Sequence, residues 1–203
     1  MVDSHEHWVW WGVPERGIQR AQIDYDSYQG KQYPAFTSER IPEGALGLPI
    51  FRTASSARRF EGRHCPPVTG GLVVDKVIID VILSFDTESY VQFHPVIIMA
   101  RGVPITHYSW IFIQATAFCI DYENLIDAEI RYHNGHPFVM EAKSFKYKSG
   151  CLGDYHIARD YYHGSHLVVS RALKNALLET GEPIDFRQPE DIAQPWWLCR
   201  PLG

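Results

Sequence analysis

The chain lacks long runs of basic residues and long runs of apolar residues. Its 19 Lys and Arg residues stand against 24 Asp and Glu residues, so the net charge at neutral pH is −5. A surface that binds the phosphates of a nucleic acid needs an excess of positive charge. No apolar stretch reaches the length of a membrane-spanning helix, and the first twenty residues lack the basic start and apolar core of a secretory signal. We therefore expect a cytoplasmic protein with neither a nucleic-acid nor a membrane partner.

Motifs of covalent, metal or cofactor chemistry are also missing. Cys65, Cys119, Cys151 and Cys199 stand far apart without a CxxC pair, which predicts reduced and mostly buried thiols rather than a disulfide framework. The sequence contains no GxGxxG, GxxxxGK[ST], HExxH or GxSxG pattern. These absences favour a protein that is not an enzyme and that needs no cofactor.

Aromatic and turn-forming residues are abundant, with 10 Phe, 6 Trp, 11 Tyr, 13 Pro and 15 Gly. This composition favours strands and turns over long helices. We predict one domain over residues 1–203, with an irregular N-terminal lobe at 1–68 and a second lobe at 69–203. Prolines recur in the first lobe and no helical period is sustained there, so we expect loops and short strands that lie over the rest of the fold.

A repeated pattern organises the second lobe. Leu-Val-Val occurs at 72–74 and again at 167–169. The next residue is Asp75 in one copy and Ser170 in the other, and both types cap helix N-termini. A short amphipathic segment follows each cap, and then a segment that contains Phe93 or Phe186. We predict two equivalent strand–helix–strand units.

The residues between the two units predict β-structure. Apolar residues occupy both faces of 107–120, which is typical of a central strand covered on both sides. Asn134-Gly135 is the strongest two-residue hairpin signal in the chain, and Gly164-Ser165 indicates a second hairpin. Strands grouped between two helices predict an α+β fold, with a mainly antiparallel sheet, a few short helices and the duplicated unit.

Two histidine pairs, His133 with His136 and His163 with His166, flank these two turns. Partners across a two-residue hairpin point their side chains to one face. If the two hairpin tips met, four imidazoles could bind one metal ion, provided that hydrogen bonds oriented each ring. The alternative, which we favour, is that these histidines form local hydrogen bonds or face solvent and hold no metal.

Two acidic segments are candidate binding surfaces. The first covers residues 121–129 and contains no basic residue, and the second precedes a Trp-Trp pair near the C-terminus. Each could be a solvated face that keeps the protein soluble. Carboxylates beside large aromatic residues also suit fast and tight association with a basic protein partner. The candidate residues are Asp121, Glu123, Asp127, Glu129, Glu182, Asp185, Glu190, Asp191, Trp196 and Trp197.

The repeated unit resembles the imm-eleven family of bacterial immunity proteins, in which a similar helix start precedes a strand with Phe and Pro. Residues 117–124 resemble that family's central segment, and residues 156–159 resemble the strand before its second repeat. The resemblance covers roughly residues 69 to 190. It implies a bacterial protein that neutralises a cognate secreted toxin by direct non-covalent binding. Such pairs belong to polymorphic toxin systems of interbacterial competition, including type VI secretion, and no catalytic residue carries over.

Three classes of function therefore stay open. The first is a toxin-neutralising binding protein, the second is a metal-dependent hydrolase built on the hairpin histidines, and the third is a structural or adaptor domain. A neighbouring gene for a large secreted protein with a small toxic C-terminal domain would favour the first class over the third.

Overall fold

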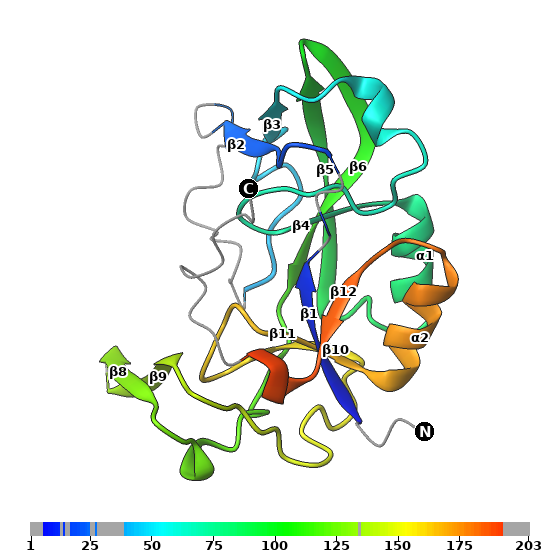
Figure 1. Cartoon of the computed structure of the whole chain (residues 1–203). Coiled ribbons are helices and arrows are strands. Elements are labelled where there is room, and N and C mark those ends of the chain that lie inside the picture. The colour runs from blue at the N-terminus through cyan, green and yellow to red at the C-terminus, as the bar shows by residue number, and fades with distance from the viewer. Residues whose placement is uncertain are drawn as a thin grey trace.

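The computed structural model describes residues 6–12, 14, 17–24, 27, 39–133 and 135–192. In Figure 1, two sheets lie beside a pair of short helices, and a separate hairpin stands at one end of the molecule. Both sheets have five strands and are mixed but mostly antiparallel. The fold is thus the α+β class that the sequence predicts. Within the described residues, no helix combines the length and the apolar character that a membrane crossing requires.

The first sheet has the strand order β2-β3-β5-β6-β4. Its longest pair, β5 and β6, is an antiparallel hairpin that turns at Arg101 and Gly102, with φ values of 49° and 83°. Positive φ at both turn residues is the requirement of a type I′ turn. The strands are β2 (Gln22–Asp24), β3 (Ile50–Thr53), β4 (Leu72–Asp75), β5 (Val91–Ala100) and β6 (Val103–Ile113).

The second sheet has the strand order β12-β1-β11-β10-β7. The N-terminal strand β1 lies between β11 and β12 and is antiparallel to both. The prediction that residues 1–68 only lie over the rest of the fold is therefore wrong. Strand β1 is an inner strand of the second sheet, and β2 and β3 belong to the first sheet. The strands are β1 (His7–Gly12), β7 (Thr116–Ala117), β10 (Ile157–Asp160), β11 (Leu167–Ser170) and β12 (Asp185–Arg187).

The duplicated unit is present. Asp75 accepts hydrogen bonds from two backbone N–H groups at the start of α1 (Lys76–Leu83), and Ser170 accepts one at the start of α2 (Arg171–Glu179). Strands β4 and β5 lie on either side of β6, as β11 and β12 lie on either side of β1. In each unit the central strand is antiparallel to both neighbours. The predicted caps and the strand positions of Phe93 and Phe186 are confirmed, and α1 packs beside α2 (Figure 1).

Strand β6 is buried on both faces. Tyr108, Trp110 and Phe112 contribute to one apolar cluster, whereas Ile111 and Ile113 contribute to the other, which also holds the inner faces of α1 and α2. Alternate side chains of a strand point to opposite faces, so one strand joins two cores. The prediction of a central strand is confirmed, although β6 ends at Ile113 and residues 116–117 pair in the second sheet.

The two predicted hairpins differ. Strands β8 (Glu129–His133) and β9 (His136–Glu141) form the first hairpin, and they pair with no other strand in the part of the chain that the structure describes. Asn134 lies outside the described residues. Strands β10 and β11 also pair, but residues 161–166 connect them, so the predicted two-residue loop at Gly164-Ser165 is wrong. Three 3₁₀ helices complete the fold: η1 (Ala57–Phe60), η2 (Tyr122–Asn124) and η3 (Pro189–Ile192).

Candidate binding surface

Exposed apolar side chains gather around the β8–β9 hairpin. Tyr132 is 69% exposed, Phe118 is 54% exposed and Ile126 is 49% exposed, and Phe138 on β9 is also exposed. In Figure 1 this hairpin lies at the end of the molecule away from α1 and α2. Exposed apolar groups are unremarkable when they are scattered, but a cluster with polar residues around it marks an interaction site.

Aromatic contacts join three separate segments into this cluster. Tyr122 stacks on Tyr162 with ring centroids 4.8 Å apart, and Phe118 packs on Tyr161 at 4.4 Å. The hydroxyl groups of Tyr122 and Tyr132 lie 3.4 Å apart, and the hydrogen bond between them raises the pKa of Tyr122. The segment after β7, the hairpin and the loop after β10 are thus in contact, although Tyr132 and Phe138 point to opposite faces of the hairpin.

The first acidic segment includes Tyr122 and so adjoins this cluster. Glu123, Asp127 and Glu129 are exposed, and Asp121 is partly exposed. Glu129 pairs with Arg131 at 2.7 Å, and ion pairs at such exposed sites are weak because water screens them. We call this region around the hairpin the acidic aromatic surface, defined as Phe118, Asp121, Tyr122, Glu123, Ile126, Asp127, Glu129, Tyr132, Phe138, Tyr161 and Tyr162.

The buried side chain of Asp160 holds two segments of this surface together through hydrogen bonds. Its side chain is 1% exposed and accepts four backbone hydrogen bonds, from Cys119 and Ile120 on one segment and from Tyr162 and His163 on the other, at 2.8 to 2.9 Å. Burial raises the pKa of Asp160 to about 6, although the four N–H donors act in the opposite direction. Asp160 was not among the candidate residues that the sequence indicated. Its one local signal is its position at the end of an apolar strand, where Asp residues often begin turns.

The histidines form local contacts. The rings of His163 and His166 stack with centroids 4.0 Å apart, and burial lowers the pKa of both. A hydrogen bond of 2.9 Å joins His166 to the Tyr147 hydroxyl, and one of 2.6 Å joins His136 to the Tyr161 hydroxyl. The side chain of His133 is outside the description. Among the described residues, no group of three or more His, Cys, Asp or Glu side chains is placed to hold a metal ion.

The second acidic segment is not one exposed patch. Glu182 is 3% exposed, accepts a hydrogen bond from the His64 backbone N–H at 2.9 Å and lies 4.0 Å from Arg63. Its proposed place on a binding surface is therefore wrong, because Gly181, with φ of 80°, turns the chain inward after α2. Asp185 pairs with a neighbouring arginine within β12, while Glu190 and Asp191 are exposed on η3 and Trp196 and Trp197 lie outside the described residues.

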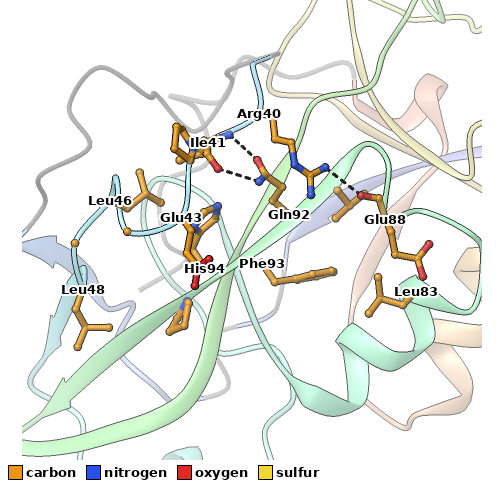
Figure 2. Close-up of a pocket in the computed structure, with 15 residues that line it drawn as sticks. Arg40, Ile41, Glu43, Leu46, Leu48, Leu83, Glu88, Gln92, Phe93 and His94 are labelled. Atoms are coloured by element: carbon orange, nitrogen blue, oxygen red, sulfur yellow. Dashed lines mark hydrogen bonds between the residues drawn. The ribbon is translucent and has the colours of Figure 1, made fainter.

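A cleft of about 900 Å³ opens elsewhere, between residues 40–48, the end of α1 and the start of β5. Figure 2 shows the Gln92 side chain bonded to both backbone groups of Ile41, at 2.7 and 3.0 Å. The Arg40 guanidinium donates to the backbone carbonyl of Glu88 at 3.3 Å. These bonds hold the 40–48 loop against β5, so the polar side chains at this cleft act mainly within the fold.

Comparison of the chain with models of known protein families gives no match, and comparison with curated proteins gives none. The resemblance to the imm-eleven family therefore rests on the sequence segments given above. Fold and site together describe an α+β protein with exposed carboxylates and aromatic side chains around the β8–β9 hairpin.

Proposed function

We propose that this protein neutralises a cognate secreted antibacterial toxin in the cytoplasm, by non-covalent binding through the acidic aromatic surface. The observation that carries the proposal is the gathering of exposed aromatic side chains and carboxylates around the β8–β9 hairpin. The resemblance of the duplicated unit to imm-eleven immunity proteins supports the choice of a toxin as the partner. The partner surface is expected to be basic.

The two kinds of side chain have different roles in this proposal. Aromatic side chains such as Tyr132 and Phe138 bury a large area and lose little rotamer entropy, so they dominate the binding energy once water is excluded. Carboxylates such as Glu123 and Asp127 attract a basic partner from a distance and orient it. Loss of the aromatic side chains should raise the dissociation rate, whereas loss of the charges should lower the association rate.

Charge reversal tests the electrostatic part. The probe is the C-terminal domain of the secreted toxin that this proposal expects a neighbouring gene to encode, and the variant carries Lys at positions 121, 123, 127 and 129. The dissociation constant should rise at least tenfold, and cells that express the toxin should lose protection. The control reverses Arg58 and Arg59 to Glu, two exposed residues of η1. Binding of the fourfold variant within twofold of wild type, in folded protein, would exclude these carboxylates from the interface.

Truncation of the hairpin aromatics tests the anchors. The double variant Tyr132→Ser and Phe138→Ser should dissociate from the same toxin domain at least tenfold faster. Leu178→Ser is the control, because Leu178 is 42% exposed on α2, which lies away from the hairpin in Figure 1. Equal dissociation rates for the double variant and the control would mean that the hairpin is not the contact.

A further inference from the structure

Two cysteines that are 32 positions apart in the sequence lie side by side. The backbone carbonyl of Cys119 accepts a hydrogen bond of 2.8 Å from the Lys148 N–H, and the Lys148 carbonyl accepts one of 3.3 Å from the Cys151 N–H. Both side chains belong to the same apolar cluster, and the thiol of Cys119 interacts directly with the sulfur of Cys151. The arrangement places two reduced thiols within reach of one another.

Cys151 is also open to a small reagent. It lines a surface cavity of about 440 Å³ together with Gly150, Leu152 and Gly153, whereas Cys119 is fully buried behind it. The His7 side chain forms a further hydrogen bond with Cys151. His7 is fixed in β1, where it pairs with Ser170. One thiol is thus reachable, one is enclosed, and an imidazole lies beside the reachable one.

The two thiols differ in acidity for a physical reason. The hydrogen bond from Cys119 and the contact with His7 lower the pKa of Cys151 to about 6, although burial acts against them. The same hydrogen bond and burial raise the pKa of Cys119. Cys151 is the more acidic thiol of the pair and the one that the cavity exposes, so we assign it as the nucleophile.

We propose that Cys119 and Cys151 form a reversible redox site that reacts with hydroperoxides. The Cys151 sulfur attacks the O–O bond, which gives a sulfenic acid on Cys151 and releases the alcohol, or water from hydrogen peroxide. The Cys119 sulfur then attacks the Cys151 sulfur, an S–S bond forms, the S–O bond breaks, and the hydroxyl leaves as water with the Cys119 proton. In total, two thiols lose two electrons and two protons, and the hydroperoxide is reduced.

Cys65 is the internal control. It is 1% exposed, and burial raises its pKa well above the usual value, with Glu182 and Asp75 adding to the shift. A buried thiol in such surroundings does not react with a peroxide from solvent, whereas Cys119 only has to reach the oxidised Cys151 beside it. Cys65 should therefore stay reduced under conditions that oxidise the proposed pair.

The experiment treats the full chain in a Cys199→Ser background with hydrogen peroxide at pH 7, blocks remaining thiols and analyses non-reduced peptides by mass spectrometry. We expect a peptide linked through Cys119 and Cys151, which dithiothreitol separates, with Cys65 still blocked as a thiol. Cys151→Ser should slow peroxide consumption at least tenfold, whereas Cys65→Ser should leave the rate unchanged.

Two results would overturn the proposal. One is a Cys151 oxidised to the sulfinic acid while Cys119 is recovered as a thiol, because the second cysteine would then not resolve the first. The other is a peroxide reaction rate that Cys151→Ser does not change. Replacing the buried Cys119 can disturb packing, so the assignment relies on the linked peptide of the otherwise native chain.

Discussion

Replacement of His166 by phenylalanine should make the fold less sensitive to acid. The His166 side chain is 1% exposed, and its ring packs on Phe145 at 4.9 Å as well as on His163. Burial lowers the pKa of His166 well below its usual value, and the nearby His163 lowers it further. Protonation therefore opposes the folded state, which keeps this ring neutral.

The sign and the magnitude follow from proton linkage. Because the folded pKa of His166 is depressed, its stabilising contribution is present above the unfolded pKa of about 6.5 and is lost as the pH falls toward the folded pKa. The loss is at most about 1.4 kcal/mol per pH unit in this range. Phenylalanine cannot bind a proton, so His166→Phe avoids this loss. At neutral pH it should be less stable by about 1 kcal/mol, because the hydrogen bond to Tyr147 is missing.

Urea unfolding at pH 7.5, 6.5 and 5, followed by tryptophan fluorescence, measures the difference in free energy of unfolding between the two proteins. Wild type should be the more stable at pH 7.5, and His166→Phe should be the more stable at pH 5. Asp160 and His163 titrate in both proteins, so most of their effect cancels in the difference. Tyr147→Phe is the control, because it removes the same hydrogen bond but keeps the histidine. If the difference in free energy of unfolding between wild type and His166→Phe were equal at pH 7.5 and at pH 5, the interpretation of His166 as a buried neutral ring would be refuted.

Three further substitutions test the fold by urea unfolding. Asp75→Ala should lower the free energy of unfolding by about 1–2 kcal/mol, because it removes the cap of α1, and an unchanged value would mean that the cap is not formed. Gly71→Ala should cost at least about 1–3 kcal/mol, because its new Cβ would overlap the Trp110 ring, and a neutral effect would contradict this close approach. Glu182→Ala should cost about 1–3 kcal/mol, because the His64 N–H loses its acceptor, whereas a solvent-exposed Glu182 would give almost no change.

The parts of the fold that the sequence predicts correctly depend on local signals. Asp75 and Ser170 cap helices because a short polar side chain reaches the first N–H groups of the next turn. The β8–β9 hairpin follows from its turn signal and its flanking strands. The β5–β6 hairpin was not predicted, because Gly102 allows positive φ in a two-residue turn but the preceding Arg101 is an unusual residue at such a position.

The parts that the sequence analysis misses depend on contacts between distant segments. Strand β1 lies between β11 and β12, more than 150 positions away, and nothing within residues 7–12 indicates that insertion. Glu182 is charged and follows a helix, which favours an exposed position. Its carboxylate nevertheless accepts a hydrogen bond from the backbone N–H of His64, 118 positions earlier. The four donors of Asp160 likewise come from two segments that only the folded chain brings together.

Amide hydrogen exchange of the protein, alone and in complex with the proposed toxin partner, tests the central claim most directly. A bound partner slows exchange where it covers the backbone or stabilises local structure. The account predicts new protection at residues 118–138 and 161–162, with little change on α1 and α2. Formation of a stable complex in which protection falls on other segments, and these two remain as in the unbound protein, would contradict it.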